Sequence, residues 1–332
     1  MTNQTASEEK ANRKLLKGDE FLNRYRIEGV LTTTAPLHLG NGFKTPDERK
    51  RPLKPEKGEA KDKKEFVEVN AVATDWRNRP VIPGSSLKGV LRSFLLDVLS
   101  ASQAGAEILA DERNRNYETI IRPGEGEEWT PVQTQEKQIT FMRERAGFLE
   151  RLFGTPFAEG KIEVWDCECA TRDLPVATPA LNNPESPPFW DKTRLTYIDQ
   201  SVAIDPDTKT AIDKKLYHYE VVPPGVDFNI AITGQNIVHI ELGMLLFGLH
   251  AFNSGIWPLT LGGMTNRGFG RCRFELKTIR YLHQCKISEW IENAALNNHA
   301  GYETLKEIPK SEIGNRVADF RTAFLAGLGG KK

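Results

Sequence analysis

The chain has 332 residues, 39% of them hydrophobic, which is enough for one large domain or two small ones around a buried core. Its 45 basic and 45 acidic side chains balance, which argues against a free-standing nucleic-acid binder but allows a local positive face. No apolar run reaches the roughly 18 residues of a transmembrane helix, and residues 1–17 lack a signal-peptide core, so we expect a cytoplasmic protein that does not bind membranes.

The first half of the chain mixes short predicted strands with one strong helix and two polar insertions. Apolar and polar residues alternate where a strand is predicted, and apolar residues recur every three or four positions where a helix is predicted. In chain order we expect a disordered arm (1–20), a strand (25–34), a loop of mixed charge (43–65), a short strand (66–73), a helix (86–101) and a polar insertion (111–137).

The second half continues the alternation and ends in a helical tail. In chain order we expect a short helix (142–153), a strand (161–171), a long excursion (173–216), a strand (224–233), a helix (240–252), a strand (276–282) and a helical appendage (284–332). The order strand, helix, strand, strand, helix, strand favours an α+β sandwich over a parallel sheet. We therefore predict one main domain over 21–283 with insertions at 43–65, 111–137 and 173–216.

A helix start with two cations follows a Pro-Gly turn. Either Ser85 or Ser86 can cap the helix, and Lys88 and Arg92 lie four residues apart and so share one face. A helix N-terminus with free N–H groups beside a short cationic ridge suits a phosphate backbone. The competing interpretation is an ordinary capped amphipathic helix whose basic face is solvated.

A basic, glycine-rich loop lies far downstream. Residues 262–270 contain four glycines, and the loop carries a Thr-Asn pair and two arginines. Glycines allow positive φ angles and close approach to a ligand, and successive N–H groups can form an anion-binding nest, although such a segment is more often a simple turn. The residues predicted to contact phosphates are Gly262, Gly263, Thr265, Asn266, Arg267, Gly268 and Arg271.

Together these segments resemble the RAMP superfamily of CRISPR-associated proteins, most closely the Cas-seven-like backbone subunits of type III effector complexes, with type III-D as the suggested subtype. Five motifs occur in the family's order, and the resemblance covers roughly residues 21–281. They are T-A-P-L-H-L-G-N-G (34–42), I-P-G-S-S-L-K-G-V-L-R (82–92), L-F-G with G-K-I-E-V-W-D (152–166), E-V-V-P-P-G-V-D-F (220–228) and G-G-M-T-N-R-G-F-G-R (262–271).

The resemblance implies a ferredoxin-like, RNA-recognition-motif-like core with long inserted loops and a thumb-like β-hairpin at 173–216. It also implies a crRNA-binding subunit of a ribonucleoprotein complex for antiviral defence, with target RNA and other effector subunits as partners. The thumb would wedge between guide and target, with aromatic side chains stacking on bases; a small satellite core under the loop is the alternative. Further residues expected to contact RNA are His38, Gly40, Arg194, Tyr197 and Lys214.

Whether the chain is an enzyme stays open in the sequence. Related subunits often cut target RNA with an aspartate in a D-x-P-V-x-x-D pattern; Asp75 matches the second, structural acid, but the first falls on Val69. Glu68 and Asp47 are the candidate substitutes for a Mg²⁺-dependent endoribonuclease. A guide-processing endoribonuclease with His38 as general acid or base is another alternative, and an RNA-independent assembly subunit a third.

The cysteines do not predict a metal site or a disulfide framework. Cys167 and Cys169 form a C-x-C on an expected strand, which differs from the usual C-x2-C or C-x4-C spacing of zinc ligands. Four cysteines in a chain of this length do not argue for a disulfide scaffold. We expect buried thiols, no metal and no firmly bound cofactor.

Overall fold

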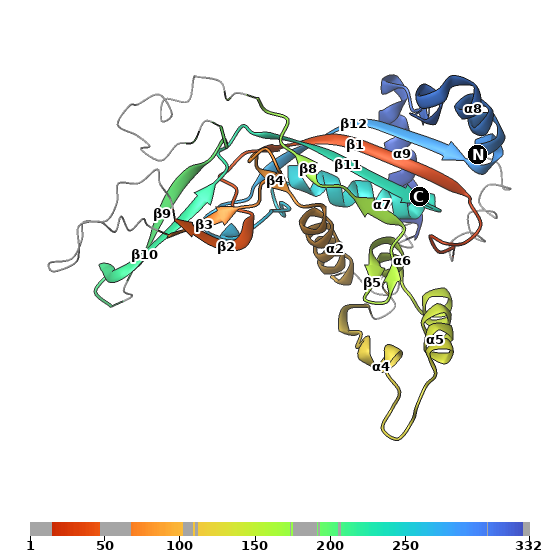
Figure 1. Ribbon diagram of the computed structural model, residues 1–332, viewed down its shortest axis with the longest axis horizontal. Coiled ribbons are helices and arrows are strands. Elements are labelled where there is room, and N and C mark those ends of the chain that lie inside the picture. Colours follow the sequence, from red (N-terminus) through yellow and green to blue (C-terminus); the bar gives the residue numbers. More distant parts are fainter. Residues whose placement is uncertain are drawn as a thin grey trace.

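The computed structural model describes residues 15–46, 68–101, 109, 112–172, 174, 191, 193–204, 207–303 and 305–327. These residues form a mixed α+β fold, as expected from the sequence. Figure 1 shows an elongated molecule in which helices lie against one face of a long sheet, while a second group of strands extends from one end. Most of the expected loop at 43–65 and much of the excursion at 173–216 lie outside the described residues.

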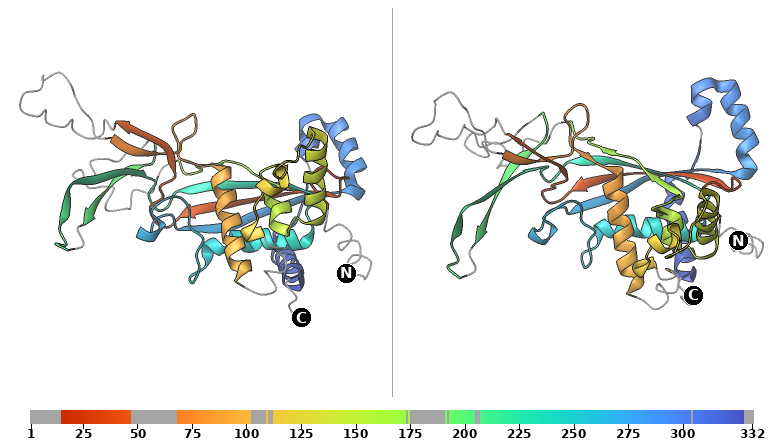
Figure 2. Two further views of the ribbon diagram at one scale, coloured as in Figure 1. Left: turned by 90° about the horizontal axis from the view of Figure 1, so that it is seen from below. Right: turned by 60° about the horizontal axis from the view of Figure 1, so that its bottom comes forward.

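The long sheet has five strands in the order β13-β12-β1-β11-β7, and neighbouring strands are antiparallel. Its strands are β1 (Asn23–Thr33), β7 (Ile162–Val164), β11 (Asp227–Gln235), β12 (Cys272–His283) and β13 (Lys306–Glu307). In the chain, α2 (Gly84–Ser100) comes between β1 and β7, and α7 (His239–His250) comes between β11 and β12. Both helices pack on the same face (Figure 2).

Alternation of side chains explains how the sheet meets these helices. In β1 the odd-numbered residues are buried and the even-numbered ones are partly exposed, which is the period of a strand covered on one face. The helix α2 presents Leu87, Leu91 and Leu95 to the same core, all of them fully buried. α7 is buried nearly all round because α9 (Lys310–Gly327) covers its outer side, where a Cβ on Gly243 would overlap the Phe320 carbonyl oxygen.

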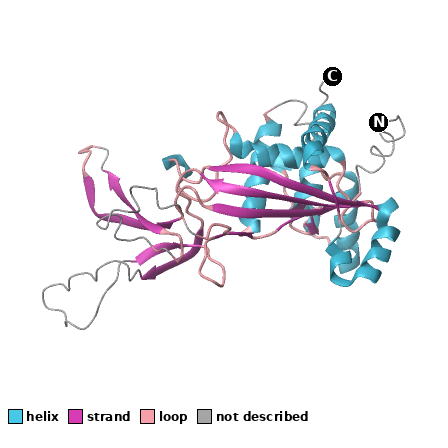
Figure 3. Cartoon of the chain, turned by 90° about the horizontal axis from the view of Figure 1, so that it is seen from above, coloured by secondary structure: helices cyan, strands magenta, loops and turns pink. Residues whose placement is uncertain are grey.

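A second sheet of four strands stands at the end of the molecule away from the C-terminal helices (Figure 3). Its order is β2 (Gly40–Pro46), β3 (Glu68–Val72), β10 (Ala211–Val221) and β9 (Tyr197–Ile204). β9 and β10 are antiparallel, whereas β10 and β3 are parallel. The expected excursion at 173–216 therefore contains paired strands where it is described.

The single strand expected at 161–171 is wrong, because the chain forms two short strands in different sheets. β7 joins the long sheet, and β8 (Cys167–Glu168) pairs with β4 (Val81–Ile82). Between them Asp166 turns toward α2, where its Oδ1 accepts a hydrogen bond from the Gly84 N–H at 2.8 Å. A further two-stranded sheet pairs β5 (Gly154–Thr155) with β6 (Ala158–Glu159).

The polar insertion expected at 111–137 contains short helices. It holds a 3₁₀ turn (Glu112–Asn114), α4 (Glu118–Ile121) and most of α5 (Pro131–Glu144), and α6 (Phe148–Phe153) follows. α5 begins with a capping box in which Thr130 and Gln133 exchange hydrogen bonds, followed by a proline at the first helical position. The helix expected at 142–153 is thus two helices, with the break at Arg145–Gly147.

The tail is helical, as predicted, but its last helix is part of the main core. α8 (Ile287–Glu303) and α9 (Lys310–Gly327) follow β12. Val317, Phe320 and Phe324 of α9 are buried in the same hydrophobic cluster as α2 and α7. The tail expected from residue 284 is therefore more than a peripheral appendage. No helix in the described part of the chain is long and apolar enough to cross a bilayer.

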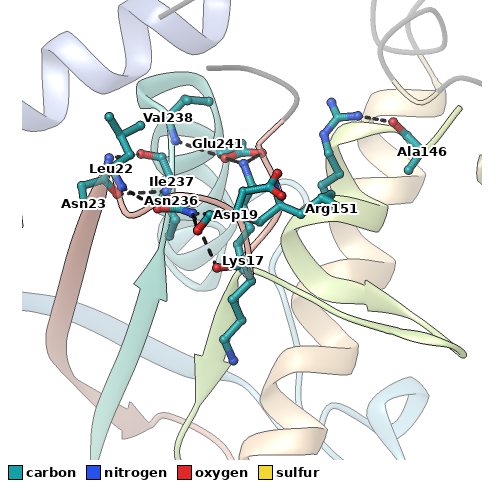
Figure 4. A network of polar contacts seen from close by, with 12 residues as sticks. Lys17, Asp19, Leu22, Asn23, Ala146, Arg151, Asn236, Ile237, Val238 and Glu241 are labelled. Atoms are coloured by element: carbon teal, nitrogen blue, oxygen red, sulfur yellow. Dashed lines mark hydrogen bonds and ion pairs between the residues drawn. The ribbon is translucent and has the colours of Figure 1, made fainter. Parts of the chain in front are cut away.

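A buried polar network joins the start of β7 to α7 (Figure 4). Lys161 Nζ lies 2.8 Å from both carboxylate oxygens of Glu241, and neither side chain is exposed. Glu241 Oε2 also accepts the Val238 N–H at 3.1 Å, which caps the helix. Asn23 and Asn236 extend the network by hydrogen bonds to the backbone beside them. Burial lowers the pKa of Lys161, and Glu241 opposes that shift.

Candidate nucleic-acid interface

Three of the motifs recognised in the sequence meet where the two sheets join. Leu37 and Val222 exchange backbone hydrogen bonds at 2.9 and 2.8 Å, which joins the segment 34–42 to the end of β10. The Gly263 N–H donates to the His38 carbonyl oxygen at 2.9 Å, which joins the same segment to the glycine-rich loop. Segments more than two hundred residues apart in the chain therefore form one surface.

The glycine-rich loop has the backbone that its sequence predicts. Gly262, Gly268 and Gly270 have φ angles of 76°, 87° and 77°, and Met264 shares the left-handed region at 59°. A Cβ on Gly262 would overlap the His38 carbonyl oxygen, so glycine is needed where the loop rests on its neighbour. The predicted contact residues that are exposed are Gly262, Gly263, Thr265, Asn266, Arg267, Gly268 and Arg271.

The loop lies beside the hairpin of the second sheet. Burial raises the pKa of Asp199 on β9, and the positive charge of Arg267 opposes that shift, which places the arginine near this strand. Tyr197, the first residue of β9, is partly buried, and burial raises its pKa to about 12. Lys214 belongs to β10, but its side chain lies outside the described residues.

His38 is held at the centre of this surface and is 8% exposed. Its Nδ1 lies 2.7 Å from the Glu220 carbonyl oxygen, which only accepts, so Nδ1 is the donor. Nε2 faces Gly40, where an added Cβ would lie 3.1 Å away. The ring also contacts Tyr219 edge to face, with the ring centres 5.4 Å apart. His38 thus joins β10 to the loop, through its side chain on one side and its carbonyl oxygen on the other.

Glu220 organises the same junction and was not predicted as a site residue. It is 2% exposed, and its carboxylate accepts hydrogen bonds from Arg194 Nε at 2.8 Å and from Arg194 Nη2 at 2.9 Å. Thr196 Oγ1 and the Val72 N–H also donate to it, at 2.7 and 3.0 Å. Arg194 therefore has a structural partner, and its expected phosphate contact stays a prediction. Only the family-like E-V-V-P-P-G stretch pointed to Glu220.

The serine cap expected for α2 is wrong. The helix begins at Gly84, before both serines, and its N-cap Pro83 has no side-chain cap. The carboxylate of Asp166 accepts the first N–H instead, so part of the positive helix end already faces a negative charge. Gly84 is needed because its backbone packs directly on Val164. Ser85 is exposed and Ser86 is partly buried.

Lys88 and Arg92 share one face of α2, as predicted, but both are partly covered. Lys88 Nζ points to the Ile162 carbonyl oxygen at 3.4 Å, and burial lowers its pKa. Arg92 donates to the Gly154 carbonyl oxygen at 3.1 Å and to Tyr117 Oη at 3.2 Å. Ser85 and Lys88 line an open cavity of about 810 Å³ on this side of the helix.

Of the acidic residues considered for catalysis, Glu68 and Asp75 lie within the described part of the chain. Glu68 is exposed at the first residue of β3, and its neighbour Val69 is buried, which agrees with the loss of the first family acid at that position. Asp75 Oδ1 accepts the N–H groups of Arg77 and Arg79, both at 2.8 Å, so it shapes a turn. Asp47 lies outside the described residues.

The cysteines that the structure describes are not arranged as a metal site, and Cys272, whose Sγ lies 3.8 Å from the Gly270 carbonyl oxygen, borders the glycine-rich loop. Cys167 and Cys272 are buried, and burial raises the pKa of each thiol to about 12. Cys169 is partly exposed and lies 3.5 Å from an Arg79 nitrogen. Within the described ranges, no group of three or more histidine, cysteine, aspartate or glutamate side chains could hold a metal ion.

Substitution of Gly262 by alanine tests the loop geometry. We expect the free energy of unfolding to fall by about 1–2 kcal/mol, because an alanine in the left-handed region costs that much before its overlap with His38 is counted. Urea unfolding measures this. The control is Gly255→Ala in the preceding loop, where no atom lies within 4 Å of an added Cβ. Equal losses in the two variants would contradict the anchoring role.

Comparison with protein families agrees with these motifs. The model of the RAMP superfamily matches residues 30–273, which is more than half of the chain and includes all five motifs. No curated protein matches the chain. The match begins within β1 and ends just inside β12, so it includes all of β7 and β11 and the whole candidate interface.

Proposed function

Because the chain belongs to the RAMP superfamily, whose members are CRISPR-associated RNA-binding proteins, we propose that it is a crRNA-binding backbone subunit of a type III interference complex. The observation that carries the proposal is the exposed basic loop around Arg267 and Arg271, anchored on the His38 segment. In this role the subunit positions guide and target RNA for antiviral defence together with other effector subunits. Base pairing reads the sequence and the protein grips the backbone.

The chemistry of the loop suits an RNA backbone. Positive φ angles at three glycines shape the loop, but the N–H groups of Gly263, Arg267, Gly268, Phe269 and Gly270 already donate to backbone carbonyl oxygens. Contacts with phosphate therefore depend on side chains rather than on a nest of these N–H groups. Arg267 and Arg271 are exposed next to them and supply the positive charge. A neutral chain with a local basic loop is what a subunit needs when most of its surface meets other proteins.

The strand order supports the finer fold class that the resemblance implies. The four strands β12-β1-β11-β7, with α2 and α7 connecting them on one face, have the order of a ferredoxin-like sheet. We propose that the β9–β10 hairpin is the thumb that separates guide from target. It extends from the body (Figure 2) and exposes Val202 and Tyr217, which are 45% and 44% accessible. Such side chains suit a wedge against bases.

Alanine substitution of Arg267 and Arg271 tests the proposal. Each change is expected to weaken binding of single-stranded guide RNA roughly tenfold, because a charged hydrogen bond to phosphate is lost. Each should also lower the slope of log affinity against log salt by about 0.7 to 1. The measurement is fluorescence anisotropy over a salt series, with exposed Lys310 of α9 changed to alanine as the matched control. Variants that keep wild-type affinity and slope would overturn the assignment.

A metal-dependent ribonuclease is the second candidate function, and the exposure of Glu68 at the start of β3 favours it. The reconstituted complex with Mg²⁺ distinguishes the two functions when wild type is compared with the double variant Glu68→Ala and Asp47→Ala. For a binding subunit we expect an unchanged ladder of cut target RNA. Loss of one position-specific cut with guide binding intact would instead make the subunit the nuclease.

A further inference from the structure

A pocket of about 670 Å³ lies at the far end of the long sheet from the glycine-rich loop. It is enclosed by the end of β12, by β13 and by the two C-terminal helices, which lie beside that strand end in Figure 1. Its size is that of a pocket for a small organic ligand. We call it the tyrosine pocket; it is lined mainly by Tyr25, Tyr281, Trp290, Lys306, Arg316 and Phe320.

The floor of the tyrosine pocket is aromatic. Tyr25 and Tyr281 are register partners on β1 and β12, and their rings lie 6.1 Å apart and nearly parallel, at 28°. His239 and Phe320 form a second ring pair at 5.3 Å. Tyr25 is buried, whereas Tyr281 is partly exposed and so offers ring surface to the pocket. Such surfaces stack on planar ligands.

The rim of the tyrosine pocket is positively charged. Its only acid among the described lining residues, Glu289, is 2.7 Å from Lys286 and is neutralised by it. Lys306 is exposed, and its Nζ lies 6.0 Å from the centre of the Tyr281 ring. Arg316 meets Asp319 only at 3.9 Å, with both side chains about half exposed. Lys306 and Arg316 therefore supply a positive charge next to the aromatic floor.

We propose that the tyrosine pocket binds one nucleotide unit, with the base against Tyr281 and the phosphate between Lys306 and Arg316. An aromatic surface beside two cations selects a ligand that is both planar and anionic, which a nucleotide is and a simple anion or an apolar molecule is not. The nucleotide is either a free mononucleotide or the phosphorylated end of an RNA strand. This site is separate from the glycine-rich loop and does not depend on it.

Calorimetric titration of the full chain with adenosine 5′-monophosphate (AMP) tests the pocket. We expect AMP to bind at least tenfold more tightly than adenosine or inorganic phosphate, and Lys306→Glu or Arg316→Glu to weaken it at least tenfold. Lys310→Glu is the matched control, because Lys310 is an exposed cation on α9 outside the pocket lining. Arg267→Ala should leave AMP binding unchanged, which separates this site from the proposed RNA interface. Equal AMP binding by wild type and Lys306→Glu would overturn the proposal.

The exposed thiol of Cys285 gives a second readout, since it lines the same pocket. Bound nucleotide should slow its alkylation by iodoacetamide several-fold, while the buried Cys167 and Cys272 do not react in the folded chain. Protection by AMP assigns the site to a free nucleotide. Protection only by a five-nucleotide RNA with a 5′-phosphate, and not by the same RNA without it, assigns the site to an RNA end. Absence of protection by either ligand overturns the proposal.

Discussion

Replacement of Glu241 by alanine is expected to lower the free energy of unfolding by about 3–5 kcal/mol, because it leaves the ammonium group of Lys161 buried without its counter-charge. The two side chains are fully buried, so water cannot replace the lost carboxylate. The same carboxylate also caps α7 through the Val238 N–H, which adds to the loss. Urea unfolding at neutral pH measures the change.

Removal of both charges, with apolar side chains of similar size in their place, distinguishes the effect of the unpaired charge from the effect of lost packing. The double variant Lys161→Met and Glu241→Leu should recover most of the lost stability, leaving a deficit of about 1 kcal/mol from the missing cap. Glu289→Ala is the surface control, because Glu289 pairs with Lys286 at 2.7 Å where both side chains are more than half exposed. We expect that control to change stability by less than about 1 kcal/mol. A double variant no more stable than Glu241→Ala would contradict the desolvation argument.

Local patterns predicted the elements that build the core. β1 was expected at 25–34 and spans Asn23–Thr33, and α7 was expected at 240–252 and spans His239–His250. These succeeded because one buried face imposes a period on the sequence. The helices within the polar insertion at 111–137 were not predicted, because α5 carries few apolar residues and its capping box at Thr130 was the better signal.

The sequence predicted the segments of the candidate interface but not the residues that contact them. Glycines in the segment 262–270 indicated a loop of positive φ angles, and the structure has it. That Asp166 caps α2, or that Glu220 holds Arg194, depends on residues between 26 and 82 positions apart, which no local pattern can connect. Arg194 therefore looked like a free cation in the sequence, although the distant Glu220 pairs with it in the structure.

The helical insertion is attached to the core through a second buried acidic cluster. Glu150 is fully buried; it accepts a hydrogen bond from Tyr117 Oη at 2.8 Å and forms an ion pair with Arg115 Nε at 2.7 Å. Glu112 accepts the Leu149 N–H at 3.1 Å, while its Oε2 has no hydrogen-bond partner among the described residues. Burial first, and the negative charge of Glu150 second, raise the pKa of Glu112 to about 8.

Glu112→Gln is therefore expected to stabilise the protein at neutral pH. Between about pH 4.5 and 8 the folded chain keeps a proton on Glu112 that the unfolded chain has released, so wild-type stability falls as pH rises, by about 1.4 kcal/mol per pH unit. Glutamine has the shape of the protonated acid and keeps the acceptor for Leu149, yet it does not titrate. At pH 7 the variant should be more stable than wild type by roughly 3 kcal/mol.

The pH dependence of this difference is the decisive measurement, because other groups titrate in the same range and cancel between the two proteins. Urea unfolding of wild type and Glu112→Gln at pH 5, 7 and 8.5 should give a difference that is small at the first pH, grows at the second and levels off above about pH 8. Glu118→Gln on α4, whose side chain is 70% exposed, should give a flat and small difference. A difference for Glu112→Gln that is equally flat would mean that Glu112 is ionised in the folded chain, with the Leu149 N–H and nearby cations outweighing the cost of its burial.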